Sequence, residues 1–315
     1  MFFSCSDTPT RTGSIQVRRE ILTGYTCRIS PERLRRGIDQ APAPVADTGG
    51  CPFCPGAVES TTPVFQDGSR IYRGESVTFP NLYPFARRHT VTVITRAHAV
   101  DRFSRKQIAD ALDAQILSLS DSGGYASINW NYLPSAGASL AHPHLQGIAD
   151  TAPSARAGRY IRKSSRYRAD TGACYWDHLR EHEARSERYC FGDELVWAAG
   201  AVPVGEKEMR GYLPVRTIAE FSSYTDMFAA DLLRIIDCYR KLGTHAFNMA
   251  LFFDKEGADS GFRAFASVIA RINPNPASTS DSAFMERLHL EPVIMTLPEE
   301  LGRIMRDSAG YDSVP

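Results

Sequence analysis

Apolar and polar positions alternate along the chain in blocks that predict strands and helices in a repeated order. Residues 76–79 and 90–95 (TVTVIT) are rich in β-branched and apolar side chains, which is typical of buried or half-buried strands. Residues 104–120 carry apolar side chains at helical spacing, and a capping-box pattern begins at Ser104, so we expect a helix there. Another strand is predicted at 125–130.

The same order recurs in the second part of the chain. Strands are predicted at 194–199 and 210–214, followed by a helix at 225–242 and a strand at 247–253. A unit of two strands, a helix and further strands therefore occurs twice at similar lengths. This repetition predicts an internal duplication and an α+β fold with two antiparallel sheets and packed helices.

The length of the chain supports two parts. A chain of 315 residues exceeds the ~250–300 residues at which one hydrophobic core usually stops growing. We place the two halves at residues 1–150 and 151–315. Residues 1–13 and 37–50 lack a periodic pattern and are expected to be connections, and a short helix should begin near Pro298.

Charge and composition exclude several classes of partner. Lys plus Arg and Asp plus Glu both number 36, so no net charge attracts nucleic acid or an anionic membrane. No apolar run approaches the ~18 residues of a membrane span and the start of the chain lacks a leader pattern, so we expect a cytoplasmic protein. Seven scattered cysteines favour a reducing compartment.

The segment 131–146 (NYLPSAGASLAHPHLQ) joins a loop of small residues, 135–139, to a His-x-His-x-Gln strand. Because residues two apart share one face of a strand, His142, His144 and Gln146 project together. The small residues can bring main-chain N–H groups close to an anion. A neutral imidazole attacks phosphorus and leaves again readily, which suits a two-step group transfer. One histidine on a strand is more often a packed core residue, but two histidines and a glutamine on one face are costly to bury without a charged partner and awkward to explain as packing.

A second motif is the C-x-x-C pair of Cys51 and Cys54, the only two cysteines whose spacing suggests chemistry. By itself such a pair fits either a redox site or half of a zinc site. The sequence contains no second C-x-x-C with which to complete a site of four cysteines.

The motif GASxxHPHxQ is similar to the active-site signature of galactose-1-phosphate uridylyltransferases, within the histidine-triad superfamily. Four further motifs resemble elements of that family and occur in its order. They are SPERLRR at 30–36, CPFCPG at 51–56, NLYPF at 81–85 and RAHAVDRFS at 96–104. The resemblance is strong over residues 25–150 and rests on pattern alone in the remainder.

The resemblance implies a duplicated histidine-triad-like fold in which residues 1–150 are the catalytic half. His144 would be the nucleophile that becomes nucleotidylated, and Gln146 would form a hydrogen bond to the phosphoryl group. The residues implied for binding phosphates or the nucleoside are Arg33, Arg36, Asn81, Asn131, Gly137 and Ser139. A guanidinium fork also matches phosphate oxygens on physical grounds.

The resemblance further implies a zinc site, with the ligands Cys51, Cys54, His98 and His142. A closed site of two thiolates and two imidazoles leaves no open position for water, so the expected role is structural. Such a site would tie the knuckle to the strand that carries His144. His89 is an alternative ligand, although packing or support of another residue is the favoured interpretation for it.

The sequence also departs from the family in its second half. Many of these uridylyltransferases carry a second metal bound by a His-x-His in the strand that mirrors the catalytic one, whereas here that strand reads FRAFASVIAR (262–271). We therefore predict that the second metal is absent and that residues 151–315 are a degenerate copy. Glu291 is a weak match to a carboxylate that binds sugar hydroxyls, and Leu82 stands where an acidic residue is common.

These observations predict a nucleotidyltransferase that moves a nucleoside monophosphate, UMP by analogy, from a nucleotide sugar to a sugar 1-phosphate. One alternative is a nucleotide-sugar or dinucleotide phosphorylase, in which inorganic phosphate accepts the nucleotide. A hydrolase is disfavoured, because small histidine-triad hydrolases usually have a third histidine where this chain has Gln146. Another alternative is a zinc-stabilised nucleotide-binding protein without turnover. A homodimer is expected from the resemblance.

Overall fold

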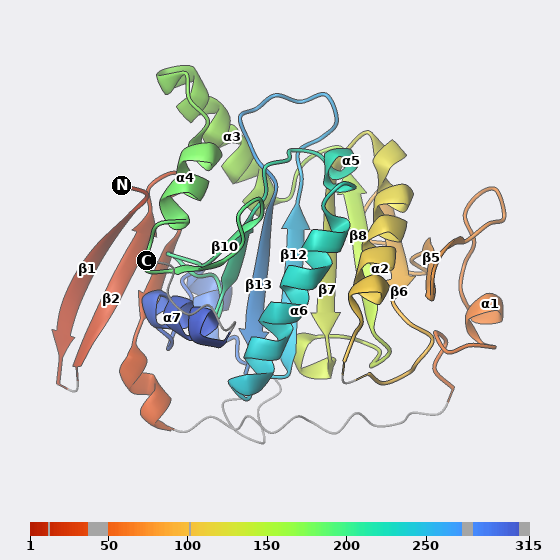
Figure 1. The fold of residues 1–315 in the computed structure, drawn as a ribbon, viewed down its shortest axis with the longest axis horizontal. Coiled ribbons are helices and arrows are strands. Elements are labelled where there is room, and N and C mark those ends of the chain that lie inside the picture. Colours follow the sequence, from red (N-terminus) through yellow and green to blue (C-terminus); the bar gives the residue numbers. More distant parts are fainter. Residues whose placement is uncertain (12, 37–49, 101, 273–279, 309–315) are drawn as a thin grey trace.

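The computed structural model describes residues 1–11, 13–36, 50–100, 102–272 and 280–308, and the statements below concern this part of the chain. It contains a ten-stranded sheet and a four-stranded sheet (Figure 1). All neighbours in the ten-stranded sheet are antiparallel. Its strands are, in spatial order, β4 (Ile71–Arg73), β5 (Ser76–Pro80), β6 (Arg88–Val93), β8 (His144–Asp150), β7 (Tyr125–Tyr132), β12 (Ala246–Phe252), β13 (Phe265–Arg271), β11 (Met209–Tyr212), β10 (Val196–Ala199) and β9 (Tyr189–Phe191).

The smaller sheet lies at one end of the molecule (Figure 1). It pairs strands from the start of the chain with β14, which precedes the last described helix. Its strands are β1 (Phe3–Thr10), β2 (Gly13–Glu20), β3 (Thr26–Ile29) and β14 (Val293–Ile294). Strand β14 pairs with β3 in parallel, and the other pairs are antiparallel. The helices are η1 (Pro31–Arg36), α1 (Val58–Thr61), α2 (Arg105–Leu119), η2 (Ser120–Ser122), η3 (Pro134–Ala136), α3 (Ala155–Thr171), α4 (Tyr175–Glu183), α5 (Ile218–Phe221), α6 (Thr225–Lys241), η4 (Met285–His289) and α7 (Pro298–Ser308).

The order of the large sheet reads as a repeat. Counted from one edge, the strands run β4, β5, β6, β8, β7; counted from the other edge, they run β9, β10, β11, β13, β12. If β4 to β8 correspond to β9 to β13, these two orders are the same, and β7 pairs with β12 at the centre. Helices α2 and α6 occupy corresponding places, after β6 and after β11. The β7–β8 and β12–β13 registers also correspond at a constant offset of 121 residues, since 125 pairs with 150 and 246 with 271. The strands of both copies thus form one continuous sheet.

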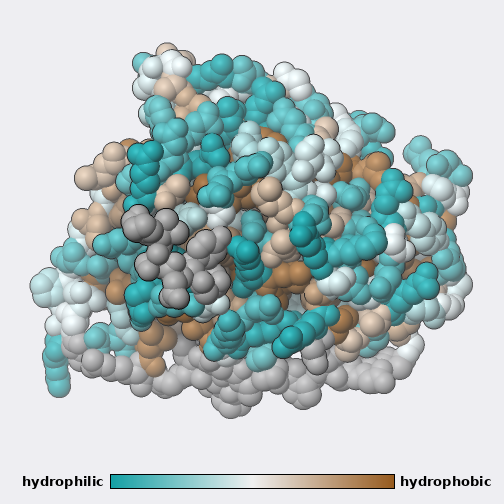
Figure 2. Space-filling model, viewed as in Figure 1, coloured by the Kyte–Doolittle hydropathy of each residue, from teal (hydrophilic) through white to brown (hydrophobic). Residues whose placement is uncertain are grey.

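Helices α2 and α6 lie side by side on one face of the large sheet and cover its main apolar core (Figure 1). The side of these helices that faces away from the sheet is largely hydrophilic (Figure 2). Gly147 of β8 allows α2 to approach closely, because a Cβ atom there would lie 2.0 Å from Oε1 of Gln115. His144 and Gln146 stand two positions apart on β8, so both project from the face opposite to Gly147.

Helices α3 and α4 cover the opposite face of the sheet at β10, β11 and β13. Tyr160 of α3 and Trp176 of α4 pack there against Phe265 of β13. The Trp176 and Phe265 rings are stacked, with centroids 5.1 Å apart. This part of the sheet is therefore enclosed by helices on both faces.

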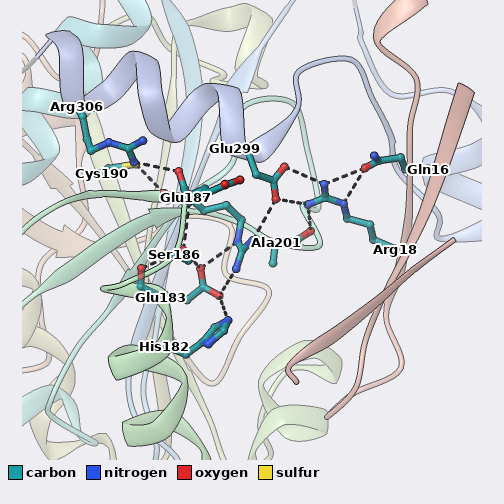
Figure 3. A network of polar contacts seen from close by, with 11 residues as sticks. Gln16, Arg18, His182, Glu183, Ser186, Glu187, Cys190, Ala201, Glu299 and Arg306 are labelled. Carbon is teal, nitrogen blue, oxygen red and sulfur yellow. Dashed lines mark hydrogen bonds and ion pairs between the residues drawn. The ribbon is translucent and has the colours of Figure 1, made fainter. Parts of the chain in front are cut away.

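A network of ion pairs fastens the small sheet to the rest of the protein (Figure 3). Arg18 of β2, which is 4% exposed, donates to both carboxylate oxygens of Glu299 at 2.9 Å. Glu299 lies at the start of α7 and also accepts from Arg188 at 3.1 Å. Arg188 in turn pairs with the buried Glu183 at 2.8 Å. Burial acts to raise the pKa of Glu299, but the hydrogen bond and charge of Arg18 outweigh it and lower that pKa.

The α+β class with two sheets is confirmed. Helix α2 begins after Ser104, whose side chain and that of Gln107 form the expected capping box, and α6 matches the second predicted helix closely. The prediction that residues 1–13 form only a connection is wrong, because β1 and the start of β2 lie there. Residues 37–49 of the other predicted connection lie outside the described part. No helix of the described part combines the length and apolar character needed to span a membrane.

Candidate active site

His144 is the first residue of β8 and is only 6% exposed. Its Nδ1 lies 2.8 Å from the main-chain oxygen of His142. A carbonyl oxygen can only accept, so Nδ1 carries the proton and Nε2 keeps its lone pair. Burial lowers the pKa of His144, which favours the neutral ring near pH 7. The ring thus has the protonation and tautomer required of a nucleophile at Nε2.

Phe53, from the turn between the two cysteines, packs edge-on against the ring of His144. The two ring centroids are 5.3 Å apart, and the ring planes are inclined at 73°. The same phenylalanine contacts Phe79 of β5 at 5.6 Å. The position of the His144 ring therefore depends on the fold of the cysteine turn.

Cys51, Cys54, His98 and His142 place their donor atoms within 4.8 Å of one another, so the four residues could hold a metal ion. The sulfur of Cys54 lies 3.3 Å from Nδ1 of His98 and 3.7 Å from Nδ1 of His142, and the sulfur of Cys51 lies 3.8 Å from Nδ1 of His142. Zinc bonds of about 2.3 Å to sulfur and about 2.0–2.1 Å to nitrogen imply donor separations of roughly 3.4–3.8 Å in a tetrahedron. The donor set and its spacing fit that ion.

His142 is held in the tautomer that such a site needs. Its Nε2 donates to the main-chain oxygen of Thr95 at 2.8 Å, so Nδ1 presents a lone pair to the two sulfur atoms. His142 is fully buried. His142 is one of the four candidate metal ligands, and its main-chain oxygen accepts the hydrogen bond from His144. It therefore links the candidate metal site to the candidate nucleophile.

Gln146 is half-buried on β8 and contacts His89 of β6. Its Oε1 lies 2.9 Å from Nε2 of His89, and Nδ2 of Asn81 lies 3.1 Å from the same nitrogen. A cavity of about 860 Å³ opens beside Asn81 and His89, with Arg87 and Asp150 also at its wall. His89 lies outside the metal cluster, so the structure supports the interpretation that it assists another residue.

Asn131 lies on β7 beside His144, one step beyond the Trp130–Leu145 pair of the register. Its Oδ1 accepts from Nδ2 of Asn248 on β12 at 2.7 Å. Asn248 accepts in turn from Arg271, at 2.7 Å. No local pattern in the sequence marks Asn248, because it lies 117 positions away from the Asn131 that it contacts.

The small-residue loop folds back on itself. Gly137 has the left-handed φ of 87° that favours glycine, but its N–H donates to the Pro134 oxygen at 2.8 Å. The N–H groups of Ala136 and Ala138 both donate to the oxygen of Leu133. Ser139 is exposed. In this conformation the N–H groups of Ala136, Gly137 and Ala138 are therefore bonded within the segment itself, and the side chain of Ser139 is exposed.

Arg33 is placed apart from this group. It lines another cavity, of about 680 Å³, together with Arg271 and Ile269 of β13, and no residue of β8 or of the loop 135–139 lines that cavity. The side chain of Arg36 lies outside the described part. Glu291 is engaged with β3, since it accepts from Arg28 at 2.9 Å and from Thr26 at 3.0 Å.

The strand that corresponds to β8 carries a different chemistry. At the offset of 121 residues, the positions of His144 and Gln146 correspond to Phe265 and Ser267 of β13. Phe265 is fully buried under α3 and α4. Ser267 donates to the buried Glu208 at 2.6 Å. The position that corresponds to His144 is thus taken by a packing residue.

The chain resembles known proteins more in its fold than in its sequence. No protein-family model matches it. A protein of Archaeoglobus fulgidus, described as uncharacterized, is 26% identical over 304 residues, which span 93% of this chain and 92% of that protein. An ADP-glucose phosphorylase from Arabidopsis thaliana, solved with bound ADP-glucose, superposes with a TM-score of 0.73 at 16% identity, over 95% of this chain and all of that one. A uridylyltransferase superposes with a TM-score of 0.70 at 18% identity, over 93% of this chain and 97% of that one. The chain therefore has the fold of the uridylyltransferase-like proteins that its sequence motifs resemble.

Proposed function

We propose that the protein is a nucleotidyltransferase that acts through a covalent intermediate on His144. The observation that carries the proposal is the hydrogen bond from Nδ1 of His144 to the His142 oxygen, which leaves Nε2 as the nucleophilic atom. Gln146 stands two residues along the same strand. The structural similarity to enzymes that handle nucleotides supports the same class of reaction.

In the first step Nε2 of His144 attacks the α-phosphorus of a nucleoside diphosphate sugar. A P–N bond forms, the bridging P–O bond breaks, and sugar 1-phosphate leaves with the electron pair. The ring then carries a positive charge, which the His142 carbonyl stabilises through the retained Nδ1–H. In the second step a phosphate oxygen of the acceptor attacks the same phosphorus, and the electron pair of the P–N bond returns to Nε2. No net proton transfer is required.

We propose that Gln146 hydrogen-bonds a non-bridging oxygen of the transferring group and that the nucleoside occupies the cavity beside Asn81 and His89. The size of this cavity, about 860 Å³, is ample for a nucleoside. We propose that Asn131, which lies one step beyond the Trp130–Leu145 pair, and Ser139 of the loop contact the phosphates or the nucleoside. UMP is the proposed nucleotide, a sugar 1-phosphate is the proposed acceptor, and a cytoplasmic homodimer is the proposed assembly, all by analogy with the family.

We propose a structural Zn²⁺ held by Cys51, Cys54, His98 and His142, and no second metal. When bound, zinc would cross-link the cysteine turn, the segment after β6 and the start of β8. We also propose that residues 1–150 are the catalytic half and residues 151–315 a degenerate copy. The correspondence of His144 with Phe265 supports this division.

A phosphorylase that uses inorganic phosphate is the second candidate, and one contact favours it. The carboxylate of Glu291, the candidate for binding sugar hydroxyls, is occupied by Arg28 and Thr26. A phosphate acceptor has no need of such a carboxylate. A binding protein without turnover is the remaining alternative.

Intact-protein mass spectrometry tests the proposal. Wild-type protein and the variants His144→Ala and His178→Ala are exposed briefly to UDP-, ADP-, GDP- and dTDP-glucose. We expect a nucleoside monophosphate adduct in the wild type and in the His178 control, and none in the His144 variant. Chasing the adduct with glucose 1-phosphate, galactose 1-phosphate or inorganic phosphate then identifies the acceptor. Absence of an adduct with every donor would contradict the covalent mechanism and favour a binding protein.

A further inference from the structure

His89 is a buried imidazole outside the metal cluster, and the two-step transfer proposed above gives it no role. It is 4% exposed and lies on β6, where it pairs with Ile148 of β8, while Val91 pairs with Gln146. His89 and Gln146 are therefore diagonal neighbours on one face of an antiparallel pair, a separation that long side chains can bridge. Their contact of 2.9 Å is the hydrogen bond that this arrangement permits.

The tautomer of His89 follows from a main-chain group. The N–H of Phe85 points at Nδ1 of His89 at 3.4 Å, and a main-chain N–H can only donate. Nδ1 must therefore accept, which leaves the single proton of the neutral ring at Nε2. Burial lowers the pKa of His89, in keeping with a neutral ring.

This tautomer decides which way the amide of Gln146 faces. With its proton at Nε2, His89 donates, so the Gln146 atom in contact is the carbonyl oxygen Oε1. The Asn81 amide nitrogen lies 3.1 Å from the same Nε2, because Tyr83 N–H holds the Asn81 oxygen at 2.8 Å. In this tautomer the Asn81 NH₂ group faces the Nε2–H and gains no hydrogen bond from His89, whereas the Gln146 oxygen accepts from Nε2. Gln146 must therefore turn its NH₂ group away from His89.

We propose that His89 is a positioning residue, which fixes the Gln146 amide so that its NH₂ group faces the phosphoryl group transferred to His144. The inference rests on the proposed function and adds to it the direction in which the Gln146 amide faces. A phosphate oxygen accepts hydrogen bonds, so a reversed amide would present a carbonyl oxygen to a negative charge. Loss of one preorganised donor to a developing oxyanion typically lowers the rate by about 10²–10³-fold.

Two variants separate positioning from simple packing. His89→Leu fills similar space but has no donor, so the Gln146 amide is free to reverse. His89→Gln retains an NH₂ group near the position of Nε2. With UDP-glucose and ADP-glucose as probes, we expect the rate of His144 adduct formation to fall about 100-fold in the Leu variant. Because His89 also lines the proposed nucleoside cavity, the concentration dependence should change too, but by much less than the rate, and the Gln variant should recover at least tenfold of the rate.

Nitrogen-15 NMR of the histidine side chains gives a second readout, which does not depend on turnover. The wild-type spectrum should show His89, assigned by its loss in the Leu variant, as the neutral Nε2–H tautomer. A neutral Nδ1–H tautomer would overturn the proposal, and so would a Leu variant that forms the adduct at the wild-type rate. Equal losses of rate and donor affinity in both variants would indicate a structural role instead. Absence of an adduct in the wild type would remove the transfer reaction, and with it any purpose for the orientation of the amide.

Discussion

Asp231 on α6 is a buried acid whose charge should destabilise the folded protein at neutral pH. It is 7% exposed, and its Oδ2 accepts a hydrogen bond from Nε1 of Trp197 at 3.0 Å. Burial raises its pKa from 3.8 to about 6, although the Trp197 bond acts in the opposite direction. The carboxylate is therefore less favourable in the folded protein than in the unfolded chain. We expect Asp231→Asn to stabilise the protein, because an amide oxygen can still accept from Trp197.

The size of the destabilisation depends on pH. Below pH 3.8 both states hold the proton and the acid costs nothing. Between pH 4 and pH 6 the unfolded chain loses its proton first, so stability falls by about 1.4 kcal/mol per pH unit. Above pH 6 the penalty is constant, with an upper value of about 3 kcal/mol for a shift of roughly two units. The gain from Asp231→Asn should therefore be largest at neutral pH and should fall toward pH 4.

Urea unfolding of zinc-saturated protein at pH 4.5, 6 and 7.5 measures this difference. We expect Asp231→Asn to raise the free energy of unfolding by about 1–3 kcal/mol at pH 7.5, because the amide NH₂ group offsets part of the gain. Asp237→Asn, on the same helix with a side chain 61% exposed, is the matched control and should change stability by less than about 0.5 kcal/mol. A gain that is the same at every pH, or larger at pH 4.5, would refute the reasoning.

Three further substitutions test other contacts. Cys54→Ser should reduce bound zinc well below one ion per chain and slow adduct formation by about 10–100-fold, and elemental analysis with mass spectrometry would show it. Gly147→Ala should destabilise by about 1–3 kcal/mol in urea unfolding, because its Cβ would lie 2.0 Å from Gln115, and an unchanged midpoint would contradict the close packing. Arg18→Ala should lower the melting temperature and should lower the free energy of unfolding by about 2 kcal/mol, because Glu299 then loses Arg18 and keeps Arg188. Arg19→Ala, at the neighbouring exposed position, is its control.

Local patterns were sufficient to predict the helices and strands around the site. The apolar spacing and capping box of 104–120 gave α2 within one residue at either end. Strand β1 carried no such signal, because seven of its eight residues are exposed and its stability comes from main-chain pairing with β2. Helices α3 and α4 were also missed. The joining of both sets of strands into one sheet depends on the β7–β12 pairing, which no local pattern encodes.

The part of the candidate site that lies on one strand could be predicted from the sequence. Alternation predicts that His144 and Gln146 share a face, and both lie on β8, whereas His142 precedes that strand. The four candidate metal ligands come from three separate segments. The resemblance to the family, and not the spacing, brought these segments together. It also implies that Arg33 lies near the phosphates, which stays a prediction; in the described part of the chain Arg33 lines a cavity together with residues of β13. Its position follows from the docking of the small sheet, which is a tertiary property.

The strands that carry no nucleophile still shape the site. Strand β12 pairs with β7 along its length, and its Asn248 holds the oxygen of Asn131 beside His144. Arg271 of β13 fixes the other end of the Asn248 amide, at 2.7 Å. Asn248 therefore supports the candidate site from the second half of the chain, while Phe265, buried under α3 and α4, occupies the position that corresponds to His144.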